Sequence, residues 1–408
     1  MKICCLEPVL APYSIPRFRA LQSLRRDDTV ELMALGATER IHERQVRTAD
    51  LGFDYVEAFP GKTVEQIDSK TLAARVIRWL DDSDPQAVVI TGYYYAAMRA
   101  AARWAKRHHR VSIFLGDSHW EDRPRTAIKE FVKGWWVRRH YDAAFAAGEQ
   151  TAAYLVRLGV PREWIWTGYD VVDNQAFADG ATAARSQGDA LRDRLGLPER
   201  YFLFVGRFAP EKNVLRLLEA YATYRQTAGQ RAWGLVLVGG GPQEPMLRER
   251  AQALRDVVFA GFQQADAVSA YYGLACCLVL PSVSETWGLV VNEGMAAGLP
   301  VLVSHRCGCV PELVRAGVNG YVCNPFDIDG IARLLGVVSS DTVDADKMGE
   351  ASRQIVELYT PETWAESLAD CIERTLAWKQ EQMKTRAYGW LSPGSWLQKQ
   401  DAEPQIRN

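Results

Sequence analysis

Short apolar runs alternate with helical stretches along the first half of the chain. The apolar runs that we expect to be strands cover residues 2–6, 30–35, 54–59, 87–91, 111–115, 142–146 and 164–168. The stretches between them that we expect to be helices cover residues 15–24, 70–80, 96–108, 127–140 and 151–158. Such alternation builds a parallel sheet with helices on both faces, and ligands bind beyond the carboxyl ends of its strands.

A second alternating series begins at residues 201–206. Its other strands are expected at residues 235–239, 257–260, 277–280, 301–304 and 320–322. Before it, residues 180–192 are small and polar, which is typical of a linker or loop. We therefore predict two Rossmann-like domains, residues 1–180 and 200–377, with a linker region over residues 181–199 and a cleft between the domains.

Composition excludes several classes of function. In the 408-residue chain, Lys and Arg (48) nearly balance Asp and Glu (50), so no overall positive field indicates a nucleic-acid partner. Four of the eight cysteines form adjacent pairs in apolar runs, which favours buried thiols. The chain has no Cys-x-x-Cys pair, which would indicate a zinc site. Glu7 and Pro8 come too early for a signal peptide, and no apolar run approaches membrane-spanning length. We expect a cytoplasmic protein.

The most informative stretch of the sequence is residues 284–300. It follows an apolar strand and predicts a helix from about Gly288 to residue 297, which Gly298-Leu299-Pro300 ends. Glu285 then lies in the loop before the helix, and Glu293 about two turns inside it. Backbone N–H groups at the helix start form a place for an anion. A ligand with a phosphate in the middle and hydroxyls at both ends would fit, and a nucleotide sugar is such a ligand.

Glu285-x7-Glu293, followed by Gly-Met-Ala-Ala-Gly-Leu-Pro-Val, resembles the donor-site motif of family 4 glycosyltransferases, which are retaining enzymes of the GT-B fold. The resemblance implies that Glu285 holds sugar hydroxyls and that Glu293 holds the nucleotide ribose. It also implies that the last helix crosses back, so that residues 378–408 join the first domain. The remaining donor-binding residues expected in this motif are Trp287, Gly288, Leu289 and Val290.

A second element, Gly206-Arg207-x4-Lys212, follows the first strand of the second domain. Arg binds phosphate as a fork and Lys as a point charge, although alone these would be two solvated loop cations. The family resemblance implies that they grip the donor diphosphate and that Phe262 borders the base. The glycine turn after residue 238 is no nicotinamide site, because Gly-x-Gly-x-x-Gly would require glycine where Glu244 stands.

The first domain departs from the family pattern. The family has a glycine-rich loop after the first strand, whereas residues 7–17 contain no glycine. It often has a catalytic histidine after the strand near residue 115, and here Asp117 and His119 are both candidates for that place. Residues 125–141 form a basic amphipathic helix with an apolar stripe. This helix either lies on an anionic membrane or packs on its own sheet, and we favour packing.

The family resemblance thus predicts a retaining glycosyltransferase that moves a sugar from a nucleoside-diphosphate sugar to an acceptor hydroxyl of a polysaccharide, glycolipid or small molecule. The donor phosphate would serve as the base. No Asp-x-Asp pair falls at the expected site, so we expect neither a metal nor another cofactor. The alternatives are another GT-B enzyme, namely a nucleotide-sugar epimerase or a sugar phosphorylase, and a non-catalytic subunit that keeps the fold.

Overall fold

A computed structural model describes residues 1–38 and 50–387 of the chain. The chain divides into two compact units. The first unit comprises residues 1–120, residues 124–169 and the chain from residue 361 on, and the second comprises residues 121–123 and 170–360. Residues 388–408, which we assigned to the first domain, lie outside the described residues.

The described part of the first unit contains a seven-stranded parallel sheet in the order β3-β2-β1-β4-β5-β6-β7. The buried strands are apolar on both faces, as a sheet covered on both sides requires. Cys5 in β1, for example, lies opposite Leu32 in β2 and Val89 in β4. The strand bounds are β1 (Lys2–Glu7), β2 (Thr29–Ala34), β3 (Asp54–Glu57), β4 (Ala87–Thr91), β5 (Val111–Gly116), β6 (Ala143–Ala146) and β7 (Ile165–Thr167).

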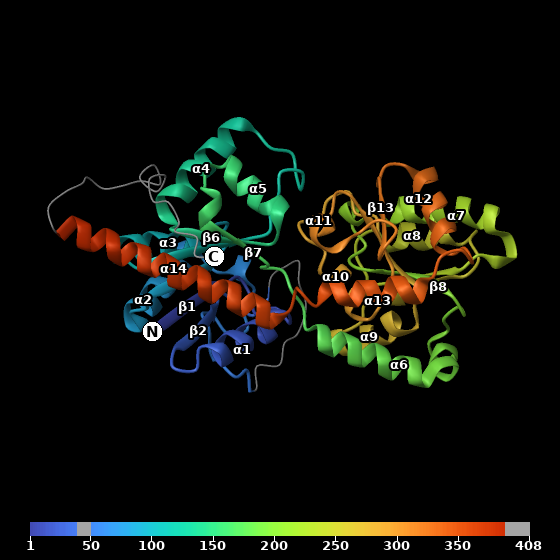
Figure 1. The fold of residues 1–408 in the computed structure, drawn as a ribbon, viewed down its shortest axis with the longest axis horizontal. Coiled ribbons are helices and arrows are strands. Elements are labelled where there is room, and N and C mark those ends of the chain that lie inside the picture. Colours follow the sequence, from blue (N-terminus) through green and yellow to red (C-terminus); the bar gives the residue numbers. More distant parts are fainter. Residues whose placement is uncertain (39–49, 388–408) are drawn as a thin grey trace, which may run out of the picture. The chain divides into compact units, whose positions relative to one another are not determined.

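Helices cover both faces of this sheet (Figure 1). One face carries α1 (Ser14–Leu24) and α14 (Pro361–Ala387), where Phe18 and Phe145 both contact the ring of Trp364. The other face carries α2 (Ser69–Ser83), α3 (Ala96–Arg107), α4 (Ala127–His140) and α5 (Glu149–Arg157). Short 3-10 turns lie at η1 (Val64–Gln66) and η2 (Arg162–Trp164).

The described part of the second unit contains a six-stranded parallel sheet in the order β10-β9-β8-β11-β12-β13. Its strands are β8 (Tyr201–Val205), β9 (Gly234–Val238), β10 (Val257–Gly261), β11 (Cys277–Leu280), β12 (Val301–Ser304) and β13 (Gly320–Cys323). The two sheets confirm the predicted pair of Rossmann-like folds, because each is parallel and alternates with helices.

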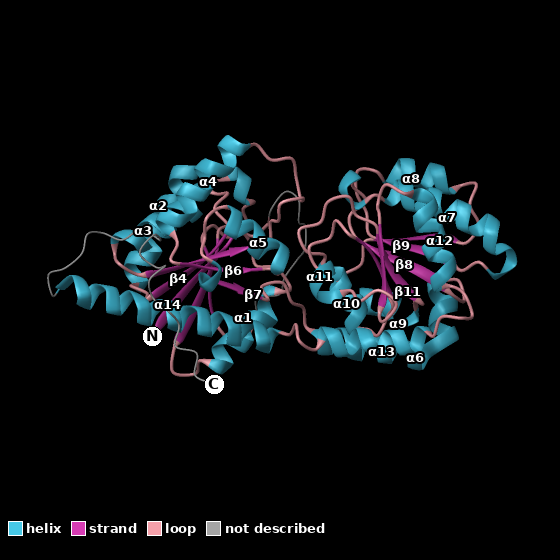
Figure 2. Ribbon diagram, turned by 45° about the horizontal axis from the view of Figure 1, so that its top comes forward, coloured by secondary structure: helices cyan, strands magenta, loops and turns pink. Residues whose placement is uncertain are grey.

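Figure 2 shows the helices of the second unit on the two sides of its sheet. One side carries α7 (Val214–Ala228), α8 (Glu244–Ala251) and α12 (Ile328–Val338). The other carries α6 (Asn174–Leu195), α9 (Ala265–Leu274), α10 (Leu289–Ala296) and α13 (Ala345–Val356). The shorter elements are η3 (Pro210–Lys212), η4 (Gly229–Arg231) and α11 (Val310–Leu313).

The expected loop at residues 180–192 is instead part of helix α6, which kinks only at Gly188. The Asp173 side chain caps the helix by accepting a hydrogen bond from the Ala176 N–H at 3.0 Å. The small residues that suggested a loop allow close helix packing: a side chain at Gly180 would begin 2.5 Å from Ser269 of α9. Alanine is also the strongest helix former, so a small-residue segment was a poor loop signal here.

The helix at residues 125–141 packs on its own unit, as we favoured, but it does so through a different face from the expected apolar stripe. Helix α4 faces inward through Gly134 and Val137, while its expected apolar stripe is exposed. Gly134 permits this approach, because a side chain there would begin 2.6 Å from the carbonyl oxygen of Leu158. All eight cysteines are free thiols, and of the four in adjacent pairs, which we expected to be buried, Cys276 alone is only partly buried. None of the helices described has the length and apolar character to cross a membrane.

Candidate functional site

Two glycine turns touch each other at the carboxyl edge of the second sheet. The Gly206 N–H donates a hydrogen bond to Val238 at 3.0 Å, and the Phe208 N–H donates one to Gly240 at 2.8 Å. A Cβ atom at Gly239 would lie 1.9 Å from the Gly206 carbonyl oxygen. Only glycine allows two backbones to come this close. The turn at residue 239 therefore packs directly against the loop at Gly206.

An ion pair joins the two motifs that the sequence analysis singled out. Lys212, at the end of η3, donates a hydrogen bond to Glu285, although the two lie 73 residues apart in the chain. Their side chains are 21% and 13% exposed. Ser282 Oγ donates to the same Glu285 oxygen at 3.3 Å, and the Val283 N–H donates to the Glu211 carbonyl at 2.9 Å. The loops after β8 and β11 are thus held together at Lys212 and Glu285.

Arg207 has a different partner from Lys212. Its guanidinium donates to Glu211 at 2.5 Å, and its side chain is 44% exposed. The sequence analysis did not single out Glu211, although its spacing of four residues from Arg207 was a signal for this pair. An exposed pair of this kind contributes little to stability. Arg207 can therefore change partner at low cost.

Asn213 is a second residue that the sequence analysis missed. It is buried and has a left-handed backbone with φ of 61° where it precedes α7. Its amide donates to the carbonyls of Pro281 (3.0 Å) and Pro325 (2.7 Å). These bonds hold the segment that carries Lys212 against the end of β11. The residue type was the available signal, because asparagine tolerates this conformation.

Helix α10 confirms the helix expected after Gly288. Gly288 has φ of 109°, so the helix begins only at Leu289, and Glu293 is its fifth residue. Glu293 therefore lies just over one turn inside, not about two. The N–H groups of Leu289 and Val290 belong to the first turn, where an α-helix provides no acceptor for them. Both residues are partly exposed, so an anion can reach this end of the helix.

Two candidate residues around α10 have buried side chains. Glu293 is 3% exposed and accepts a hydrogen bond at 2.6 Å from the hydroxyl of Tyr272 in α9. Trp287 is 2% exposed and donates from its ring nitrogen to Asn292 at 3.0 Å. The Trp287 ring thus supports the turn from within. Phe262 differs from both, because it follows β10 and is 57% exposed.

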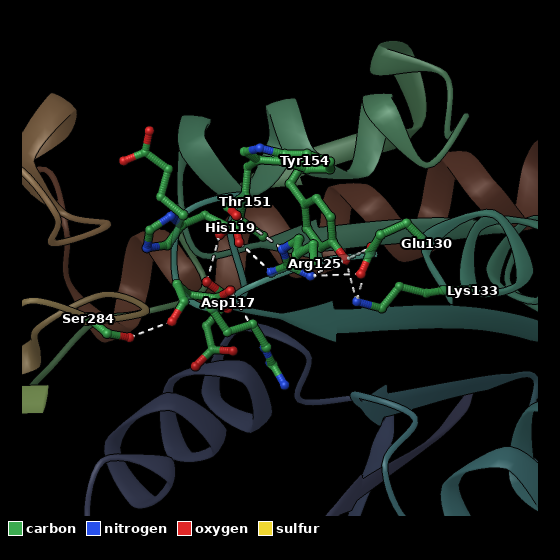
Figure 3. A network of polar contacts seen from close by, with 12 residues as sticks. Asp117, His119, Arg125, Glu130, Lys133, Thr151, Tyr154 and Ser284 are labelled. Carbon is green, nitrogen blue, oxygen red and sulfur yellow. Dashed lines mark hydrogen bonds and ion pairs between the residues drawn. The ribbon is translucent and has the colours of Figure 1, made fainter. Parts of the chain in front are cut away.

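In the first unit, Asp117 and His119 follow strand β5 on a loop held through its backbone (Figure 3). Thr151 donates to the Asp117 carbonyl at 2.9 Å, and Arg125 donates to the carbonyls of His119 and Trp120. His119 is 1% exposed, whereas Asp117 is partly exposed. The structure therefore places both candidates on one loop.

Figure 3 also shows how Arg125 is fixed. Its guanidinium lies 4.0 Å from the centre of the Tyr154 ring and 3.3 Å from Glu130, which also pairs with Lys133. Burial alone would raise the pKa of Glu130, but the Tyr154 hydroxyl and these two cations lower it overall. Glu130 therefore stays ionised and holds both cations.

The candidate residues fall into two groups that the structure describes separately. Gly206, Arg207, Lys212, Glu285, Glu293 and the start of α10 lie at the carboxyl ends of β8 and β11 in the second unit. Asp117 and His119 follow β5 in the first. Within residues 1–38 and 50–387, no group of three or more His, Cys, Asp or Glu side chains could hold a metal ion.

Comparison with known proteins identifies relatives of this chain. Residues 189–355 match the family model described as glycosyl transferases group 1. The sulfoquinovosyl transferase SQD2 of Arabidopsis thaliana is 30% identical over 289 residues, which cover 68% of this chain and 52% of that protein. The alpha-D-kanosaminyltransferase of Streptomyces kanamyceticus is 37% identical over 167 residues, or 39% of this chain and 42% of that protein. The chain thus spans about half the length of these curated relatives.

Solved structures share the fold over most of the chain. The crystal structure of Anabaena HepE in complex with UDP has a TM-score of 0.70 at 17% identity, covering 92% of this chain and 100% of that one. The sucrose-phosphate synthase of Thermosynechococcus elongatus has a TM-score of 0.70 at 18% identity, with 92% and 99% covered. At these identities the likeness concerns the fold, and it agrees with the expected GT-B architecture.

Proposed function

Because residues 189–355 make this chain a member of the group 1 glycosyl transferases, we propose that it transfers a sugar from a nucleoside-diphosphate sugar to an acceptor hydroxyl. The observation that carries the proposal is the ion pair between Lys212 and Glu285. It joins the expected phosphate-binding lysine to the expected sugar-binding glutamate, next to the start of α10. This is the arrangement that a donor with a diphosphate beside its sugar requires.

The reaction needs stabilisation of the charge that grows on the departing diphosphate. Lys212 carries three N–H donors, so it can keep its bond to Glu285 and bind a phosphate oxygen as well. Arg207 can leave Glu211 for a phosphate, to which it offers a forked pair of donors. The first-turn N–H groups of α10 add a partial positive charge. In this proposal Lys212 also holds Glu285 in place to bind the sugar hydroxyls.

Glu293 serves the nucleotide end of the donor in this proposal. A carboxylate can accept several hydrogen bonds, so the Tyr272 hydroxyl can fix its direction while ribose hydroxyls bind to it. Phe262 offers an exposed ring for the base at the end of β10. We propose that the donor phosphate takes the proton of the acceptor hydroxyl as the sugar leaves. The new bond then forms on the face that the phosphate left, with retention of configuration.

We propose that no metal takes part, because two cations and a helix start already supply positive charge for the diphosphate. The transfer rate should then be the same with and without EDTA. Activity that disappears with EDTA and returns with magnesium or manganese would contradict this charge balance.

The donor is best identified by a thermal-shift screen with UDP-, GDP- and dTDP-sugars, because a ligand raises the melting temperature of the state that binds it. A structural neighbour, HepE, was solved with UDP-glucose, so UDP-sugars come first. We expect one nucleotide class to raise the melting temperature, and Lys212→Ala to reduce that shift. The proposal is wrong if no nucleotide sugar shifts the melting temperature and none loses its sugar to a range of hydroxyl acceptors.

We place acceptor binding with Asp117 and His119, on the loop after β5. One of them would occupy the position of the histidine expected there. We also propose that the chain contacts a membrane surface peripherally and encounters its acceptor there. Asp117→Asn and His119→Gln should then lower the transfer rate without changing the shift that the nucleotide produces.

A further inference from the structure

Helix α4 exposes a continuous row of large apolar side chains. Ile128 is 79% exposed, Phe131 72%, Val132 56% and Trp135 52%. Their spacing of three, four and seven residues places them on one face of the helix. We call these four residues the α4 stripe. Elsewhere in the described chain, large exposed apolar residues such as Phe326 and Leu358 are isolated in the sequence, and single exposed apolar residues are normal on a protein surface.

The opposite face of α4 explains why the stripe points outward. Gly134 and Val137 are buried, while Glu130 and Lys133 face the internal cluster around Tyr154. Trp136 adds a contact to Tyr93 in the loop after β4, with ring centres 6.1 Å apart. The inner side of the helix is therefore fixed by packing and polar bonds. The helix cannot turn the α4 stripe inward without breaking these contacts.

The charge around the α4 stripe is positive. Lys129 and Arg139 are exposed on the same helix. The one carboxylate on α4 is Glu130, which is 15% exposed and pairs with Arg125 and Lys133. An approaching surface thus meets apolar side chains flanked by cations. This combination is complementary to an anionic lipid surface.

We infer that the α4 stripe docks on the surface of an anionic lipid bilayer. Ile128, Phe131, Val132 and Trp135 enter the boundary between headgroups and acyl chains, and Lys129 and Arg139 contact the lipid phosphates. The inference deepens the peripheral contact proposed above and rests on that proposal for its biological setting. Vesicle binding tests it without a donor or an acceptor, so it can fail or hold independently of sugar transfer.

The neighbourhood of α4 supports this occupant. The helix follows the loop that carries Asp117 and His119, and Arg125 ties the two together through the His119 carbonyl. Tyr94, in the loop after β4 that contacts Trp136 through Tyr93, is 82% exposed. A bilayer under the α4 stripe would therefore lie near the carboxyl edge of the first sheet. A hydroxyl on a lipid headgroup could reach the proposed acceptor loop there.

The test is flotation of the full chain with vesicles of equimolar phosphatidylglycerol and phosphatidylcholine, and with vesicles of phosphatidylcholine alone. We expect binding to the anionic vesicles that weakens as salt is added. The double variant Phe131→Ser, Trp135→Ser should bind about tenfold more weakly or worse, because two large apolar side chains no longer enter the bilayer. Lys129→Gln and Arg139→Gln should each weaken binding about fivefold.

The matched control is Phe326→Ser, Leu358→Ser, which removes two apolar side chains of similar exposure (55% and 71%) from the second unit. It should float as the parent chain does. Melting temperatures of all variants confirm that each is folded. The inference is wrong if the control variant loses as much vesicle binding as Phe131→Ser, Trp135→Ser does. It is also wrong if the parent chain binds phosphatidylcholine vesicles as well as anionic ones, or floats with neither.

A second copy of this chain is the competing occupant. A dimer in solution that Phe131→Ser, Trp135→Ser converts to monomer would make the α4 stripe a protein interface and overturn the inference. The nucleotide thermal shift should be unchanged in the same variant. If the parent chain binds vesicles but no nucleotide, the docking surface stands and the proposed transfer reaction fails.

Discussion

The carboxyl edges of the two sheets are built in different ways. In the second unit, charged side chains from separate loops pair with each other, as Lys212 does with Glu285. In the first unit, the loop after β5 is held through backbone carbonyls, which Thr151 and Arg125 contact. One edge depends on side chains that must be particular residues. In the loop after β5, the acceptors of these bonds are backbone atoms that any residue supplies.

This difference explains where the family could be identified. A site made of paired side chains and touching glycine turns leaves a spaced motif in the sequence, and the family model matches residues 189–355, within the second unit. In the loop after β5, by contrast, Thr151 and Arg125 donate to the backbone carbonyls of Asp117 and His119, and any residue supplies such an acceptor. The first unit can therefore keep its fold while the residues of its loops differ.

The largest effect should come from Glu285→Gln, which removes the charge that pairs with Lys212. We expect kcat to fall roughly a hundredfold, because a sugar that is displaced by about an ångström reacts far more slowly. The inhibition constant of the free nucleotide should change little. The control is Glu211→Gln, on the neighbouring loop, which should keep most of the activity. A variant whose nucleotide affinity falls by the same factor as its kcat would show that Glu285 does not act on the sugar.

Arg207→Ala should have the next largest effect. Loss of a charge-assisted bond to phosphate should cost about 1.5–3 kcal/mol, which is a decrease of roughly ten- to hundredfold in kcat/KM. Stability should hardly change, because the exposed pair with Glu211 contributes little. Steady-state kinetics and thermal unfolding of the same sample separate the two effects. Unchanged transfer rates in the Arg207→Ala, Lys212→Ala double variant would contradict the whole donor site.

Tyr272→Phe tests the interior of the same edge. It removes the hydroxyl that donates to buried Glu293, and we expect the free energy of unfolding to decrease by about 1–2 kcal/mol. KM for the donor should rise as well, because Glu293 loses its fixed direction. Urea unfolding measures the first effect and steady-state kinetics the second. Tyr271→Phe on the same helix is the control, and an equal loss there would mean that the bond to Glu293 is unimportant.

The smallest effect concerns Glu7, a buried acid at the carboxyl end of β1. Burial raises its pKa, although the Ser14 hydroxyl at 2.6 Å and nearby Arg17 oppose the rise. The folded chain thus holds the Glu7 proton more tightly than the unfolded chain. Stability should therefore be highest when Glu7 is protonated in both states, and should fall as the pH rises through the raised pKa.

Glu7→Gln keeps an acceptor for Ser14 but cannot ionise. The free energy of unfolding of the variant should not fall as the pH rises, so the variant should be more stable than the parent chain at neutral pH. Below about pH 4 the two chains should be equally stable. Urea midpoints across this range measure it, with the exposed Glu163→Gln as the control. If the urea midpoints of the parent chain and of Glu7→Gln change in parallel with pH, burial of ionised Glu7 does not destabilise the fold.

The sequence by itself determined the order of the strands along the chain and the existence of α10. Buried parallel strands leave continuous apolar runs, and a glycine after the β11 loop followed by Gly-Leu-Pro bounds a helix. It also determined the two motifs of the proposed donor site, because their residue types and spacing are local properties of the chain.

Only the tertiary structure decided which contacts those residues make. Periodicity identified the apolar face of α4 but not its direction, because Gly134 and Val137 on the other side pack more closely against the unit. Composition suggested a loop at residues 180–192, but close packing against α9 stabilises a helix there. The burial of Glu293 beneath Tyr272 and the pairing of Lys212 with Glu285 join residues far apart in the chain. Local patterns cannot report such contacts, because they form only when distant segments pack together.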